Sequence, residues 1–152
     1  MRRDYFTLDV TTGPGEAEKP SVTVEFDGPA ETLEDRLTDE KGAPLGAQRI
    51  DVSYRLLDGE MGADATGVFA LTTRITGEFI LECNADAGAI RQLVEAARAY
   101  GNTANADDGR FAVTVYSNGR EALAHEKSTF LVYDTDGDLL RQHSLIPSNV
   151  EL

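Results

Sequence analysis

Apolar and polar residues alternate along most of the chain, and this period of two restricts the fold to one built mainly from strands. Phe6, Leu8 and Val10 share one face of a predicted strand, and Val22, Val24 and Phe26 share a face of the next. The same pattern predicts strands over 5–10, 21–27, 50–56, 68–74, 78–84, 111–116, 120–125, 128–133 and 139–146.

Turn residues separate these strands into hairpins. A hairpin is predicted to turn near Thr76-Gly77, and its second arm should place Phe79, Leu81 and Cys83 on one face. Asn118-Gly119 favours the positive φ angles of a tight turn. The last hairpin should pair Tyr133 with Asp138.

One segment, at about 87–100, has the period of an amphipathic helix. Asp86 is a candidate N-cap, and Gly101 stands where a left-handed C-terminal residue is wanted. The apolar stripe consists of Ile90, Leu93, Val94, Ala97 and Tyr100. Residues 30–38 fit either a loop or a short helix capped by Thr32. The predicted class is α+β, a mainly antiparallel sheet built from hairpins with one helix packed on it.

The length of 152 residues predicts one domain over 1–152, with flexible loops at 11–20 and 102–109. No repeat or linker interrupts it.

The most unusual property of the composition is its acidity. The chain has 27 Asp and Glu against 14 Lys and Arg, a formal net charge of −13 spread almost evenly along its length. Such charge repels nucleic acid and anionic membranes, so neither is an expected partner. It is typical of adaptation to a cytosol at molar salt, where a Debye length of about 3 Å removes the self-repulsion of the fold.

No apolar stretch approaches the length of a membrane helix, and none follows Arg2-Arg3 as a secretory signal would require. Cys83 has no partner cysteine and lies on an apolar face, so it is expected in the core. These features predict a cytoplasmic protein.

Two groups of residues are candidates for chemistry. Asp134, Asp136 and Asp138 offer carboxylates at spacings that suit a cation, but the glycine and glutamate of a calcium loop are missing, so we interpret them as a hairpin turn. The candidate ligand-binding residues are His125, Lys127, Arg141 and His143. No catalytic residue, metal site or cofactor is assigned, since phosphate-binding loops and a nucleophile elbow are absent from the sequence.

Three stretches carry a family resemblance: MRRDYFTLDV, VEFDGPAETLEDRL and EKSTFLVYDTDGDLLRQHSLIPSNVEL. On these the whole chain resembles a family of small acidic uncharacterised haloarchaeal proteins, a domain of unknown function. The resemblance implies a halophilic cytoplasm and no particular activity.

Strand-rich sequence without a recognisable site favours a non-catalytic interaction or structural module of a high-salt cytosol, with an unidentified protein partner. Two alternatives stay open. One is a small enzyme or ligand-binding domain with a pocket between the helix and the sheet, and the other is an acidic partner of a basic protein. A pocket of at least about 300 Å³ that contains a histidine would favour the ligand-binding alternative.

Overall fold

Two four-stranded sheets account for the eight strands found in residues 3–12, 19–61, 65–74, 76–103 and 109–147, which are the residues that the computed structural model describes. The first sheet has the order β1 (Phe6–Thr11), β2 (Ser21–Phe26), β6 (Phe111–Ser117) and β7 (Arg120–Lys127). The second has the order β5 (Phe79–Asp86), β4 (Thr66–Thr73), β3 (Ile50–Leu56) and β8 (Leu131–Tyr133).

Each sheet contains one parallel pair. β2 pairs with β6 and β3 pairs with β8 in parallel, whereas the other neighbours are antiparallel. The α+β class and its mainly antiparallel pairing are confirmed. The strands divide between two sheets, however. In each sheet the parallel pair joins two segments that are distant in the sequence and that no hairpin connects.

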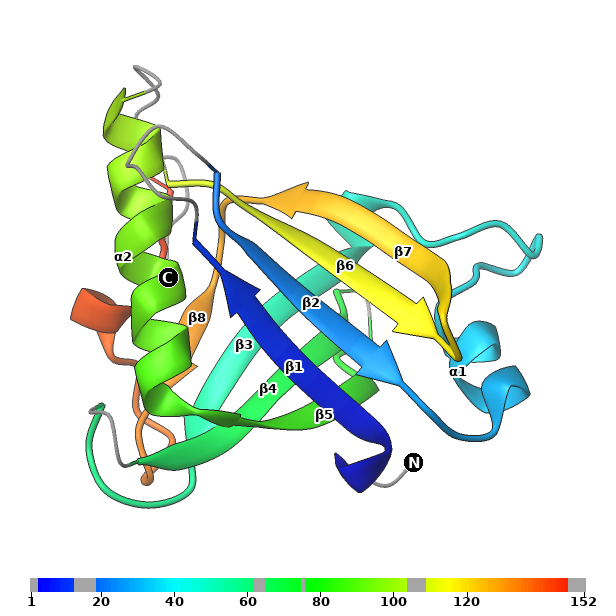
Figure 1. The fold of residues 1–152 in the computed structure, drawn as a ribbon, viewed down its shortest axis with the longest axis horizontal. Helices are drawn as coiled ribbons and strands as arrows, with labels where there is room; N and C mark the ends of the chain where they lie inside the picture. The colour runs from blue at the N-terminus through cyan, green and yellow to red at the C-terminus, as the bar shows by residue number, and fades with distance from the viewer. Residues whose placement is uncertain (1–2, 13–18, 62–64, 75, 104–108, 148–152) are drawn as a thin grey trace.

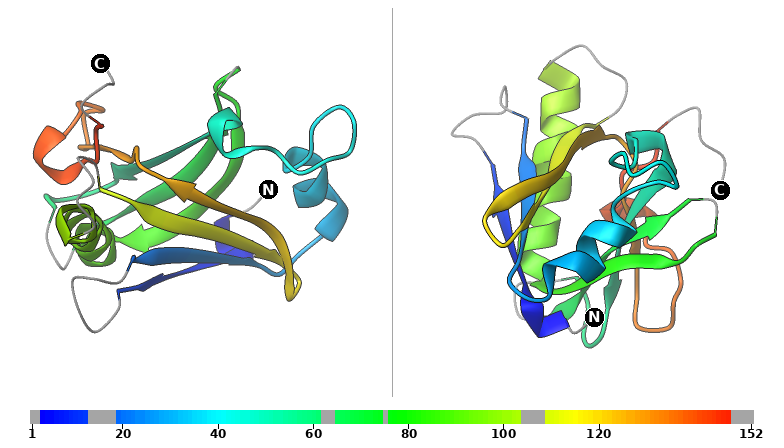
Figure 2. Two further views of the ribbon diagram at one scale, coloured as in Figure 1. Left: turned by 90° about the horizontal axis from the view of Figure 1, so that it is seen from above. Right: turned by 90° about the vertical axis from the view of Figure 1, so that its right-hand side faces the viewer.

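The core lies between the inner faces of the two sheets, and α2 (Ala87–Thr103) covers the side left open beside them (Figures 1 and 2). The predicted helical stripe is buried at Ile90, Leu93, Val94 and Ala97, so its assignment is confirmed. The helix continues through Gly101 to Thr103, three residues past its expected end. None of the described helices is long and apolar enough to cross a membrane.

Residues 30–38 form mostly helix. α1 (Ala30–Arg36) begins after Pro29, whose extended backbone precedes the first turn, so the expectation that Thr32 caps it is wrong. Leu33 and Leu37 are one turn apart and buried in the core, which stabilises a helix too short to persist alone.

A β-bulge in β5 changes which of its residues face the core. Leu71 pairs with Leu81 but Thr72 pairs with Phe79, so Ile80 is inserted without a partner. One inserted residue reverses the alternation beyond it. Phe79 is therefore 54% exposed, and its predicted place beside Leu81 and Cys83 is wrong.

The last predicted hairpin forms with an irregular second arm. Isolated bridges join Tyr133 to Leu139 and Phe130 to Leu145, and the 3-10 helix η3 (Arg141–His143) stands between them. The six residue steps from 139 to 145 thus span the distance covered by three steps, from 130 to 133, on the other arm, so the second arm cannot remain a strand. The expected pairing of Tyr133 with Asp138 is displaced by one residue.

The predicted flexible loops at 11–20 and 102–109 lie largely outside the described residues, at 13–18 and 104–108.

Candidate functional site

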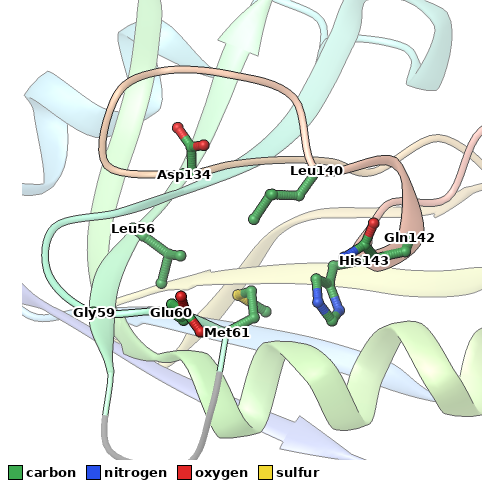
Figure 3. Close-up of a pocket in the computed structure, with 8 residues that line it drawn as sticks. All are labelled: Leu56, Gly59, Glu60, Met61, Asp134, Leu140, Gln142 and His143. Atoms are coloured by element: carbon green, nitrogen blue, oxygen red, sulfur yellow. The ribbon is translucent and has the colours of Figure 1, made fainter.

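A cavity of about 330 Å³ lies where the end of β3, the following loop, the end of β8 and η3 meet (Figure 3). Its lining consists of Leu56, Gly59, Glu60, Met61, Asp134, Leu140, Gln142 and His143. The elements converge because β3 and β8 are parallel neighbours, so their C-terminal ends lie at the same edge of the sheet. The 3-10 helix η3, which follows the turn after β8, then places His143 at that edge.

Leu56, Met61 and Leu140 give the cavity its apolar part, and their side chains point toward its middle (Figure 3). Leu56 and Met61 are buried and Leu140 packs against the core. None of these three residues was predicted from the sequence to line a site, and neither were Gly59, Glu60 and Gln142. A signal was available for Met61, the only large apolar side chain in the loop of 58–66.

His143 stands at the end of the cavity beside α2 (Figure 3). Its side chain is half-buried, and within the described part of the chain neither ring nitrogen has a hydrogen-bond partner. Burial lowers the pKa of His143, the nearby Arg91 and Arg98 lower it further, and Glu95 opposes them. The imidazole is therefore neutral at neutral pH and offers the cavity one donor and one acceptor.

Arg98 joins α2 to this end of the cavity. Its Nη2 donates a hydrogen bond of 2.7 Å to the carbonyl oxygen of Ser144. The Ser144 hydroxyl in turn donates to the carbonyl of Leu140 at 2.8 Å and accepts from the backbone N–H of Val132 at 2.9 Å. The backbone around His143 is thus held on both sides.

The opposite end of the cavity is acidic, with Asp134 on the turn after β8 (Figure 3) and Glu60 on the loop after β3. Asp134 Oδ1 accepts hydrogen bonds of 2.9 Å from the backbone N–H groups of Asp136 and Asp138. Gly137 follows with a φ of 85° and completes the turn. These contacts agree with the interpretation of the three aspartates as a hairpin turn.

Carboxylate oxygens of Asp134, Asp136 and Asp138 lie within 4.8 Å of one another. Asp136 and Asp138 are exposed, and Asp134 is already held by the turn. Hydrogen bonding within the turn explains this proximity without an ion.

His125 and Lys127 do not line the cavity. Both lie on β7 and contact the segment that leads into β3. His125 Nε2 lies 2.7 Å from the carbonyl oxygen of Leu45, and Lys127 Nζ donates to the carbonyls of Ala47 and Ile50 at 2.7 and 2.6 Å. Burial lowers the pKa of Lys127, with Arg74 adding to the effect and Asp51 opposing it. The hydrogen bonds of these two candidates join β7 to the segment that leads into β3, which is a structural role.

Arg141 is exposed on η3 and does not line the cavity, although its neighbours Gln142 and His143 do. Of the four candidate ligand-binding residues, His143 is therefore the one that the described structure places at a cavity.

Cys83 is fully buried, as expected, and burial raises the pKa of its thiol to about 11.

A second hollow, of about 410 Å³, lies nearer to the expected place between the helix and the sheets. Ala89 of α2, Leu8 of β1 and Asn84 of β5 are among its lining residues. No histidine lines it, and Thr66 in its wall is already hydrogen-bonded to Asp58.

Comparison with known proteins gives one match. The model of a "Family of unknown function (DUF5793)" matches residues 1–152. Neither a curated protein nor a solved structure matches the chain.

Proposed function

We propose, since the chain belongs to a family of unknown function (DUF5793), that it is a non-catalytic binding module whose cavity beside η3 holds a small zwitterionic molecule with an apolar body. The observation that carries the proposal is His143, half-buried at a cavity of about 330 Å³ with both ring nitrogens free of hydrogen bonds to described residues. Small-molecule pockets begin at about 300 Å³ and combine apolar walls with a few polar groups.

The distribution of charge around the cavity selects the ligand class. Glu60 makes one end negative and suits an ammonium group, whereas the carboxylate of Asp134 is turned into its own hairpin. The other end has His143, with Arg91 and Arg98 close enough to lower its pKa, and suits a carboxylate. Leu56, Met61 and Leu140 lie between and suit an aliphatic chain. An ω-amino acid, with its ammonium and carboxylate groups at opposite ends of a methylene chain, has these three parts in this order.

The surroundings of His143 support binding over catalysis. The charges that act on its ring come mostly from Arg91 and Arg98, which favour an anionic group at this end of the cavity and disfavour the protonated imidazole that a general acid needs. The buried thiol of Cys83, with its pKa raised to about 11, is also unsuited to act as a nucleophile.

The test is an NMR titration with ε-aminocaproate, pentylamine and hexanoate, observing the Met61 methyl group and the His143 ring. We expect ε-aminocaproate to shift both signals and to bind at least about tenfold (1.4 kcal/mol) more tightly than either half-molecule. Equal binding of pentylamine would show that the basic end contributes nothing. Signals that none of the three compounds moves would refute the binding site itself.

Single substitutions test whether the ligand binds in this cavity. His143→Ala and Glu60→Gln should each weaken the binding of ε-aminocaproate, because each removes a polar group at one end of the cavity. Arg141→Gln is the matched control, since it removes a charge from the same 3-10 helix without changing the lining.

We also propose that the net charge of −13 is an adaptation to a cytosol at molar salt. The even spread of carboxylates supports this, because screening would relieve repulsion everywhere on such a surface. Unfolding in urea at increasing KCl tests it, and we expect higher stability in about 2 M than in about 50 mM KCl. Equal stability at the two concentrations would contradict the adaptation.

A further inference from the structure

We infer that the outer face of the second sheet is an interface at which two copies of this chain associate about a two-fold axis. The face bears an exposed aromatic side chain beside a hollow, together with two residues of opposite charge that have no ion-pair partner among the described residues. None of these features belongs to the cavity beside η3, so the inference is independent of the proposed ligand.

The pairing of the strands defines the face residue by residue. Glu82, Ala70, Ser53 and Leu131 form one row across β5, β4, β3 and β8. Asn84, Val68, Arg55 and Tyr133 form the next. At the bulged end of β5, Phe79 pairs with Thr72 and so joins the same face.

The middle of the face is apolar and hollow. Val68 and Ala70 are buried, 3% and 4% exposed, yet they do not belong to the main core cluster between the sheets. They form the floor of a hollow of about 170 Å³, whose wall includes Phe79 and Tyr133. Phe79 is 54% exposed, so the bulge that turned it outward has placed a large apolar side chain beside an apolar depression.

The charges of the face are complementary to those of a second copy. Arg55 and Glu82 lie on β3 and β5, on opposite sides of β4. Neither has an ion-pair partner in the described part of the chain. In a two-fold interface every contact between two different residues is made twice. Arg55 of one copy can therefore contact Glu82 of the other, and Glu82 of the first copy can contact Arg55 of the second.

In such an interface each exposed Phe79 is covered by the facing copy, whose own apolar hollow lies on the same face. A basic partner would be attracted elsewhere, because Arg55 and Glu82 cancel among the residues that line the hollow while the chain as a whole carries −13. Two copies repel over their acidic surfaces, and the surroundings of the hollow, whose lining has no net charge, are where they can approach. Association should therefore require salt, which shortens the Debye length from about 10 Å at 0.1 M to about 3 Å at 1 M.

Sedimentation equilibrium of the full chain tests the inference. We expect dimers in about 2 M KCl and monomers in about 0.1 M KCl. Phe79→Ser should shift the high-salt sample to monomer. Tyr116→Ser is the control, since Tyr116 lies on β6 in the first sheet and so outside this face, and it should leave the dimer intact. Circular dichroism checks that both variants fold.

Charge exchange identifies the contact. Arg55→Glu and Glu82→Arg should each weaken the dimer at least about tenfold (1.4 kcal/mol), and the double variant should restore it. A wild-type chain that stays monomeric in high salt overturns the inference. So does a dimer that survives Phe79→Ser, or a double variant that stays as weak as the single ones.

Discussion

The Nζ of Lys127 lies 2.6 Å from the carbonyl oxygen of Ile50, and this contact joins the last residue of β7 in one sheet to the first residue of β3 in the other. Lys127 is 8% exposed and also donates to the carbonyl of Ala47. His125, two residues earlier, reaches the carbonyl of Leu45 in the same segment. Side chains that the sequence offered as ligand-binding candidates therefore fasten the two sheets together.

Lys127→Met should lower the free energy of unfolding by about 1–3 kcal/mol. The methionine fills the space of the stem but leaves the carbonyl oxygen of Ile50 without this donor, at about 1–3 kcal/mol for a buried group left unpaired. The carbonyl of Ala47 keeps the hydrogen bond from the backbone N–H of Ile50. Urea unfolding measures the loss. Lys19→Met is the control, because it removes a partly exposed ion pair with Glu126 worth about 0–1 kcal/mol. A Lys127→Met chain as stable as the wild type would contradict the structural role.

Two substitutions at Asn118 can separate the energetic cost of its left-handed backbone from the contribution of its side-chain hydrogen bonds to stability. Its φ is 50°, and its side-chain amide exchanges hydrogen bonds of 3.1 and 3.2 Å with the backbone of Gly28. Asn118→Gly keeps the left-handed backbone and loses those bonds, for about 1 kcal/mol. Asn118→Ala loses them and adds about 1 kcal/mol of left-handed strain. Thermal unfolding should rank wild type, glycine and alanine in that order, and equal values for the two variants would exclude the strain.

Gly67 permits the packing of Tyr54. A Cβ there would lie 2.5 Å from Tyr54 Oη and would also collide with the backbone oxygen of Arg55. Tyr54 is fully buried and donates a hydrogen bond of 2.7 Å to the carbonyl of Ala85, so it cannot move aside. Gly67→Ala should destabilise the chain by about 1–3 kcal/mol in urea unfolding. Gly46→Ala, which meets the flexible end of Gln48, should stay within about 0.5 kcal/mol of wild type.

His143 predicts how stability depends on pH. Its folded-state pKa is lowered below 6.5 by burial and by Arg91 and Arg98, so the unfolded chain binds the proton first as the pH falls. The free energy of unfolding should therefore decrease as the pH drops from 6.5 through the folded-state pKa. His143→Gln should make this decrease smaller, which urea unfolding at about pH 7.5 and 5.5 would show. An NMR titration midpoint of His143 above 6.5 would contradict the prediction.

Local patterns predicted the strands and the long helix well, because alternation and the 3.6-residue period are imposed by which face each residue buries. The turn at Asn118-Gly119 followed from the same local chemistry, and both residues have positive φ angles. What local patterns could not supply was the partner of a strand. β6 and β8 bind strands from much earlier in the chain, and no turn signal marks such a pairing.

For a similar reason, the sequence predicted only one part of the candidate site. His143 was singled out by residue type, and the structure places it at a cavity. Its neighbours Leu56 and Met61 come from a segment some eighty residues away that reads as a strand end and a loop. The bulge at Ile80 and the 3-10 helix at 141–143 each break an alternation that the sequence shows unbroken, so Phe79 and the second arm of the last hairpin were misplaced.

The two parallel pairs have a consequence for the chain as it is synthesised. β2 and β3 emerge early, but β2 receives its second neighbour only when β6 has been made, and β3 only when β8 has been made. Until then both strands present open hydrogen-bonding edges, which favour pairing with other chains. Closing such distant contacts is also slow, because much loop entropy is lost before the pairs form. The nascent chain is thus most prone to aggregate just before its last strands leave the ribosome.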